Sequence, residues 1–168
     1  MERKVKIKGV ILDVDGTLTD GKKYYFNAPN LTIAKSFSVR DGKGIDLAQK
    51  KGIKFAIITA DKWELITERA KDLKISDLFY NCHNKIEAVN KFISLNNLKK
   101  TELCFIGDDV NDIPLMKIVA LPIAVGDAVD AVKEVCSNKN GYITKTLGGN
   151  GAVREALEYV MRINDESN

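Results

Sequence analysis

Short apolar runs alternate with helix-like segments along the chain, and this alternation limits the possible folds more than any other feature. The apolar runs have the length of strands buried on both faces and lie at residues 10–12, 55–58, 78–80, 103–106 and 123–125. Apolar residues recur with helical spacing between them, at 44–51, 63–73, 86–95, 112–119 and 128–135. The pattern predicts an α/β fold with a doubly wound parallel sheet, in which ligands bind beyond the carboxyl ends of the strands.

The size and composition favour one domain spanning residues 1–168, since 45% hydrophobic residues suffice for a single core. A net charge of +3, spread along the chain, does not indicate a nucleic-acid-binding stripe but is compatible with an anionic small-molecule partner. No apolar run approaches the ~20 residues that span a bilayer, so we expect no membrane partner. The three cysteines have no metal-site spacing, which favours a reducing compartment and a cytoplasmic location.

One segment departs from the alternation of strand and helix. In residues 31–39 the odd positions are apolar except Lys35, which is the period of a strand with one apolar face. Residues 27–30 read as a turn, and 23–26 as a partner strand. We therefore expect a β-hairpin insertion at about 20–39, after the first strand. Its apolar face needs a cover that the core does not supply, which predicts oligomerisation through the hairpin.

Polar side chains capable of chemistry follow three of the predicted strands, and a lysine opens the third helix. Several carboxylates crowded at one sheet edge repel each other unless a cation holds them, and a hard ion with oxygen ligands, Mg²⁺ by default, meets that need. The residues concerned are Asp13 and Asp15, then Thr59 and Asp61, then Lys85, and finally Asp108, Asp109 and Asp112.

This set of groups suits phosphate-monoester hydrolysis, which needs a nucleophile and strong electrostatic help. We expect Asp13 to attack phosphorus and form an aspartyl-phosphate, while Asp15 protonates the departing alkoxide and later activates water. Lys85 would offset phosphoryl charge, and the Thr59 hydroxyl would hold a phosphoryl oxygen. A receiver domain also clusters Asp, Thr and Lys, but the Asp13/Asp15 pair beside Asp108 fits that class poorly.

The chain resembles the haloacid dehalogenase (HAD) superfamily of phosphatases through four ordered motifs: 13–19 (DVDGTLT), 57–59 (IIT), Lys85 and 107–112 (GDDVND). The resemblance implies a HAD-like Rossmannoid fold. It also implies that the metal is held by the Asp13 side chain, the Asp15 backbone carbonyl and Asp108, with Asp109 or Asp112 in the outer shell.

The segments between the motifs are too short for a separate cap domain, so we expect a capless enzyme. The chain is similar throughout to the capless 3-deoxy-D-manno-octulosonate 8-phosphate (KDO 8-phosphate) phosphatases of cell-envelope carbohydrate synthesis. The resemblance implies a homotetramer assembled by the hairpins, with active sites at subunit interfaces. It also implies that the glycine-rich tail, about 146–168, reaches a neighbouring site. Arg40 and Arg69 would contact the anionic substrate, although pairing with nearby surface acids is an equal alternative.

One departure from that family concerns the substrate. The family usually reads Thr-Gly-Arg after its second strand, whereas this chain reads Thr59-Ala60-Asp61, so an anion replaces a cation among the expected substrate-binding residues. A nonulosonate 9-phosphate or another sugar phosphate is therefore an alternative substrate, and a non-catalytic tetramerisation module is an alternative function. Trp63, close to this position, either lines the pocket or packs at an interface.

Overall fold

A six-stranded parallel sheet forms the centre of the computed structural model, which describes residues 6–27 and 32–167 of the chain. The strand order β5-β4-β1-β6-β7-β8 confirms the predicted doubly wound architecture. The expected strands are present, with β1, β4 and β5 beginning one residue and β7 two residues earlier than predicted, while β8 is too short to give a sequence signal. The strands are β1 Gly9–Leu12, β4 Lys54–Ile58, β5 Asp77–Phe79, β6 Leu103–Gly107, β7 Leu121–Ala124 and β8 Tyr142–Ile143.

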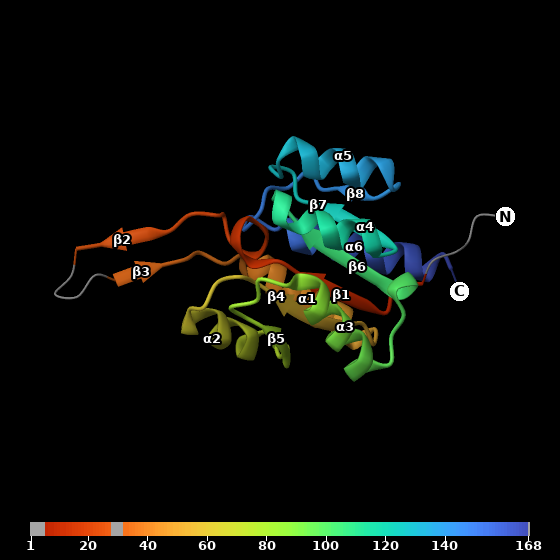
Figure 1. Cartoon of the computed structure of the whole chain (residues 1–168), viewed down its shortest axis with the longest axis horizontal. Coiled ribbons are helices and arrows are strands. Elements are labelled where there is room, and N and C mark those ends of the chain that lie inside the picture. The colour runs from red at the N-terminus through yellow and green to blue at the C-terminus, as the bar shows by residue number, and fades with distance from the viewer. Residues whose placement is uncertain (1–5, 28–31, 168) are drawn as a thin grey trace.

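Helices cover both faces of this sheet (Figure 1). Helix α1 packs against α6, while α3 packs against α4 and α4 against α5. Helix α1 begins five residues earlier than predicted, so Arg40 lies within its first turn. The helices are α1 Val39–Lys50, α2 Glu64–Asp72, α3 Lys85–Asn96, α4 Ile113–Ile118, α5 Asp130–Asn138 and α6 Ala152–Asp165, with short turns η1 Val14–Leu18, η2 Lys100–Glu102 and η3 Val110–Asp112. None of the described helices is long and apolar enough to cross a membrane.

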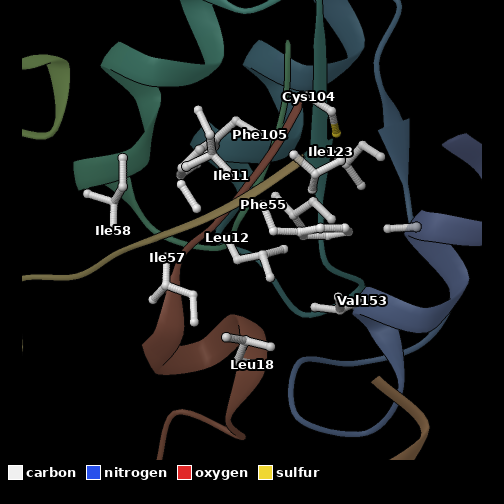
Figure 2. Packing of buried hydrophobic residues seen from close by; sticks show 14 of the residues in the cluster. Ile11, Leu12, Leu18, Phe55, Ile57, Ile58, Cys104, Phe105, Ile123 and Val153 are labelled. Carbon is white, nitrogen blue, oxygen red and sulfur yellow. The ribbon is translucent and has the colours of Figure 1, made fainter. Parts of the chain in front are cut away.

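The central strands are buried at consecutive positions because helices cover both faces of the sheet. Figure 2 shows Leu12 of β1, Ile57 of β4 and Phe105 of β6 within this core. Leu12 pairs with Ile57 on one side and with Ile106 on the other. Because the three parallel strands end level with one another, the residues that follow them meet at one edge of the sheet.

A separate two-stranded antiparallel sheet follows β1, which confirms the predicted hairpin (Figure 1). Its strands are β2 Tyr24–Phe26 and β3 Thr32–Ala34, and residues 28–31 of the predicted turn region lie outside the described residues. The second strand is shorter than the predicted 31–39, because it ends where the Lys35 side chain turns toward the main domain and binds carboxylates there. In Figure 1 the hairpin projects away from the six-stranded sheet.

The C-terminal segment differs from the expected glycine-rich tail. The glycines are confined to 148–151, and the rest forms α6, whose inner side is buried against the chain's own core. The signal was available, because the apolar residues of this segment have amphipathic helical spacing, at Val153, Ala156, Leu157 and Val160. The glycine-rich turn itself lies on the chain's own η1 segment, since the Gly149 amide donates to the Thr17 carbonyl over 3.0 Å.

Candidate active site

Asp13 occupies the carboxyl end of β1 and is buried, as the position of the first motif predicts. Lys85, the first residue of α3, reaches the same point from the other side and donates from Nζ to Asp13 Oδ1 over 2.6 Å. The same ammonium donates to Asp112 Oδ1 over 2.7 Å, and all three side chains are almost inaccessible to solvent. The structure therefore brings together three of the residues that the motifs identify.

The segment after β6 supplies the other carboxylates. Asp108 lies beside the first-motif loop, where Thr17 Oγ1 donates to its Oδ1 over 3.2 Å. Asp112 turns back toward the strand end, and its Oδ2 accepts the Asp108 amide over 3.0 Å. Asp112 is thus fixed at both oxygens by the chain itself, which suits a supporting role better than direct metal ligation.

Two glycines make room for these carboxylates. A Cβ atom at Gly16 would lie 2.0 Å from Asp108 Oδ2, and Gly16 has a φ of +85°, which L-residues rarely adopt. A Cβ atom at Gly107 would lie 2.3 Å from Asp112 Oδ2. Both glycines therefore leave space for a carboxylate, and Gly16 in addition permits a backbone conformation that other residues rarely adopt.

Asp13, Asp108 and Asp112 together form a candidate cation site, because ligand oxygens of the three lie within 4.8 Å of one another. A set of carboxylate oxygens is the donor set that Mg²⁺ prefers. Lys85 supplies only one positive charge against three carboxylates, so the cluster has an unbalanced negative charge. The residues present thus fit a hard divalent cation.

The crowding also changes the protonation of the cluster. Burial, followed by the nearby Asp112 charge, raises the pKa of Asp13 despite the opposing effect of Lys85. Burial and then Asp112 likewise raise the pKa of Asp108 to about 7. Lys85 stays charged, because attraction from Asp13 and Asp112 overcomes the effect of its burial and raises its pKa. Without a bound cation, the site therefore favours protonated carboxyls.

Thr59 and Asp61 follow β4 at the same edge of the sheet. The buried Thr59 hydroxyl oxygen accepts the Asp61 amide over 3.1 Å, which leaves its O–H free to donate. Asp15 and Asp61 both line a cavity of about 480 Å³ together with Lys23, Trp63 and the exposed His83, and Lys62, Ala60 and Asn81 complete its lining. Trp63 therefore lines this cavity in the single chain.

Lys35 is the main site residue that the sequence did not identify. Its Nζ donates to Asp15 Oδ1 over 2.5 Å and forms a second ion pair with Asp61. Burial lowers the pKa of Lys35, but the hydrogen bonds and charges of the two carboxylates raise it above its ordinary value. The only sequence signal was the one polar residue among the odd positions of the hairpin strand.

Three of the predicted residues contribute no side-chain atom to the cluster of Asp13, Asp108 and Asp112. Asp109 is exposed, and its side chain accepts its neighbour's amide, from Val110, over 2.7 Å. Arg40 is exposed at the start of α1. Arg69 lies over the Phe37 ring and donates to the Ser38 carbonyl over 3.3 Å. Neither arginine lines the cavity that contains Asp15 and Asp61.

The glycine-rich turn at 148–151 packs directly against the backbone of the first-motif loop. A Cβ atom at Gly148 would lie 1.7 Å from the Gly16 carbonyl oxygen, so only glycine permits this approach. Glu155 of α6 anchors the preceding segment by accepting the Lys145 and Thr146 amides over 2.8 and 2.9 Å. Burial opposes its ionisation, but hydrogen bonds from the Thr146 hydroxyl, the two amides and the Tyr142 hydroxyl lower the pKa of Glu155 to about 2, so the anchor stays ionised.

The Asp13, Lys85 and Asp108 arrangement at the carboxyl ends of a parallel sheet defines the class of a haloacid dehalogenase-like hydrolase, and the sequence profile of that family matches residues 74–155. The phosphatase KdsC of Escherichia coli strain B, which acts on 3-deoxy-D-manno-octulosonate 8-phosphate, is 36% identical over 161 residues, covering 96% of this chain and 82% of the relative. The chain belongs to this family of 3-deoxy-D-manno-octulosonate 8-phosphate phosphatases, which are phosphoric monoester hydrolases.

Solved structures support the same assignment. The family's phosphatase from Yersinia pestis superposes with a TM-score of 0.89 at 33% identity, covering 99% of this chain and 86% of that one. The phosphatase from Moraxella catarrhalis superposes with a TM-score of 0.88 at 31% identity, covering 98% of this chain and 91% of that one. The Moraxella structure contains a magnesium ion, a phosphate ion and KDO.

The raised pKa values predict a pH-dependent response to Mg²⁺. A carboxyl whose pKa is higher in the folded state than in the unfolded state lowers the stability of the fold as the pH rises between the two pKa values. For Asp108 these are about 4 in the unfolded state and about 7 in the folded state. Mg²⁺ requires the ionised forms and should offset this loss. We expect the increase in melting temperature on adding Mg²⁺ to be larger at about pH 8 than at about pH 5.5.

Differential scanning fluorimetry at both pH values, with and without the ion, measures this response. Asp108→Asn should raise the melting temperature of the metal-free protein at the higher pH, because it removes a repelled charge, and should abolish most of the Mg²⁺ response. An equal Mg²⁺ response of the wild type at both pH values would contradict the assignment.

The contact between Gly16 and Asp108 predicts a severe effect of Gly16→Ala. The added methyl group would displace the Asp108 carboxylate, so we expect loss of the Mg²⁺-induced stabilisation. Gly52→Ala is a matched control, because Gly52 has nearly the same φ of +83° but its Cβ would meet no atom within 4 Å. The control should lose only about 1–2 kcal/mol of stability to backbone strain and keep its Mg²⁺ response. Equal Mg²⁺ responses of the two variants would refute the steric explanation.

Proposed function

We propose that this chain hydrolyses 3-deoxy-D-manno-octulosonate 8-phosphate to the free sugar acid and phosphate, with Mg²⁺ as cofactor. The observation that carries the proposal is the buried Asp13 carboxylate, oriented by Lys85 and adjacent to Asp108. The relatives from Escherichia coli and Yersinia pestis, named for this reaction, match nearly the whole chain.

The cation would be held by the Asp13 side chain, the Asp15 backbone carbonyl and Asp108, with Asp112 in support. Asp15 and Gly16 leave helical geometry within η1, at φ −74°, ψ 118° and φ 85°, ψ −9°, which frees backbone groups there from helical hydrogen bonding. When bound, Mg²⁺ offsets the negative charge of the carboxylates and of the substrate phosphate. The magnesium ion in the Moraxella catarrhalis relative supports this choice of metal.

The protein groups divide the reaction between them. Lys85 occupies Oδ1 of Asp13, which leaves Oδ2 for attack on phosphorus and formation of the aspartyl-phosphate. Asp15, whose side chain is 40% exposed at the cavity, protonates the departing sugar oxygen and then takes a proton from the water that attacks the intermediate. The free Thr59 O–H and the Lys85 ammonium hold the phosphoryl oxygens through both steps.

The open cavity suits an anionic sugar because Lys23 and Lys62 both line it beside Trp63. We retain Arg40 and Arg69 as proposed substrate contacts in the assembled protein only. Arg40 suits this role better, since it is exposed at the start of α1, whereas Arg69 is held by Phe37 and Ser38. In an oligomer either arginine would approach the site of a neighbouring subunit.

We further propose that the hairpins assemble a homotetramer whose active sites lie at the subunit interfaces. The projecting β2 strand exposes three consecutive aromatic residues, with exposed fractions of 39% for Tyr24, 61% for Tyr25 and 53% for Phe26. A two-stranded hairpin is marginally stable on its own, and burying these rings against a second copy of the chain would stabilise it.

The nucleophile assignment predicts that Asp13→Asn abolishes phosphate release. We expect at least about a 10³-fold loss in kcat with KDO 8-phosphate, because an amide does not form the acyl-phosphate. Steady-state phosphate release with Mg²⁺ should be measured alongside nonulosonate 9-phosphates and hexose phosphates. Asp130→Asn, a change of the same kind on the exposed surface of α5, should retain wild-type rates.

Each alternative has a distinct outcome in the same assay. Faster turnover of a nine-carbon 9-phosphate would move the assignment to a nonulosonate phosphatase. Equal rates with all sugars would oppose a dedicated biosynthetic role. No release by the wild-type protein from any ester would favour the non-catalytic tetramerisation module. Activity that survives Asp13→Asn would overturn the nucleophile assignment.

The oligomer proposal predicts that charge on the hairpin separates the subunits. The double variant Tyr25→Lys, Phe26→Lys should sediment as a smaller species than the wild type, because repelled ammonium groups replace buried rings. Leu95→Lys is a matched control, since Leu95 is 62% exposed on α3, away from the hairpin, and should not change the mass. Light scattering that finds the wild type monomeric at micromolar concentration would refute the proposal.

A further inference from the structure

Lys35 links the hairpin to the active-site edge of the sheet. It follows the last residue of β3, and its side chain is inaccessible to solvent. Its ammonium contacts two carboxylates from different parts of the chain, Asp15 after β1 and Asp61 after β4. Burying a lysine is costly unless its charge is paired, so this placement is held by the two carboxylates.

Asp61 is the anchor of this arrangement. One of its oxygens, Oδ2, is paired with Lys35, and the other, Oδ1, accepts the Trp63 amide over 3.2 Å. The indole ring of Trp63 in turn lies 5.1 Å from the Lys35 ammonium. Because both Asp61 oxygens already bind the chain itself, Asp61 is better suited to holding Lys35 than to binding substrate.

The two oxygens of Asp15 have different surroundings. Oδ1 accepts the Lys35 N–H over 2.5 Å. Within the described residues, no group donates to Oδ2. Because one oxygen is tied back to the hairpin, the carboxyl group has a fixed orientation and offers the other oxygen to the cavity that Asp15 lines.

We propose that Lys35, anchored on Asp61, is a positioning residue that holds Asp15 in the orientation required to protonate the leaving group. This inference rests on the proposed phosphatase function. It gives Asp61 the role of holding Lys35 rather than of binding substrate, because both Asp61 oxygens already bind groups of the chain itself. Lys35 itself neither gains nor loses a proton during the reaction.

The step that depends on this orientation is cleavage of the ester bond. As the bond between Asp13 and phosphorus forms, the bond from phosphorus to the sugar oxygen breaks, and that oxygen keeps the electron pair. It accepts the proton carried on Asp15 Oδ2, so the alcohol leaves neutral and Asp15 becomes a carboxylate. An alkoxide needs this proton because it is a strong base, whereas 4-nitrophenolate leaves without it.

This difference provides the test. Lys35→Met should lower kcat at least tenfold for benzyl phosphate, an alkyl ester, but less than about threefold for 4-nitrophenyl phosphate. Both probes are aromatic and uncharged beyond the phosphate, so recognition of a sugar carboxylate does not affect the comparison. Asp61→Asn, which removes the charge that anchors Lys35, should shift the ratio of the benzyl phosphate rate to the 4-nitrophenyl phosphate rate in the same direction as Lys35→Met. Lys35→Arg keeps a cation and should shift this ratio less than Lys35→Met.

Lys23→Met is the matched control. The Lys23 ammonium lies at the same distance of 5.1 Å from the Trp63 ring and Lys23 lines the same cavity, but it is not paired with Asp15. This variant should change both esters by a similar factor and leave the rate ratio as in the wild type. A shift of the ratio as large as that of Lys35→Met would show a general charge effect and overturn the proposal.

The remaining outcomes are also decisive. Equal loss on both esters in Lys35→Met and in Asp61→Asn would show a purely structural ion pair. An unchanged benzyl phosphate rate with a raised KM only for KDO 8-phosphate would show that Lys35 binds the sugar acid instead. The absence of phosphate release by the wild type from any ester would refute the proposed function itself, a result distinct from both.

Discussion

The excess of negative charge at the carboxyl ends of β1 and β6 is the constraint on which the rest of the site depends. Asp13, Asp108 and Asp112 converge there because parallel strands in register end together, and Lys85 offsets only part of their charge. Repulsion within this cluster lowers the stability of the folded protein without a bound cation, and binding of a cation offsets that loss. Gly16 is part of the same constraint, because a side chain there would exclude the carboxylate that the cation needs.

Most of the residues of this charged cluster were predictable from the sequence. Buried parallel strands are continuous apolar runs, so their ends are visible, and Asp13, Thr59 and Asp108 stand directly after such ends. Lys85 was predictable from the motif order alone, since no local pattern distinguishes it from a solvated lysine. Boundaries were less accurate: α1 begins early and β8 is only two residues long, because tertiary pairing rather than local preference fixes both.

The second charge cluster could not be read in the same way. In the sequence, Asp61 looks like a lone anion beside the proposed phosphate site. Its partner Lys35 lies 26 residues earlier, on a hairpin whose position over the sheet depends on three-dimensional packing. The structure therefore shows that the Asp61 charge is compensated by a cation from another element, Lys35, which Asp61 shares with Asp15.

The hairpin therefore contributes both an exposed aromatic surface and a residue that contacts the active site. Its tip exposes Tyr25 and Phe26, which require a cover, and its base carries Lys35, which holds Asp15. A two-stranded ribbon without a cover fluctuates, and motion at the tip reaches the base through only a few residues. Burying the tips in an oligomer would thus restrict Lys35 as well. In a capless phosphatase no second domain closes over the site, so the proposed assembly would be a means of ordering Asp15, the proposed acid–base carboxylate, from outside the core.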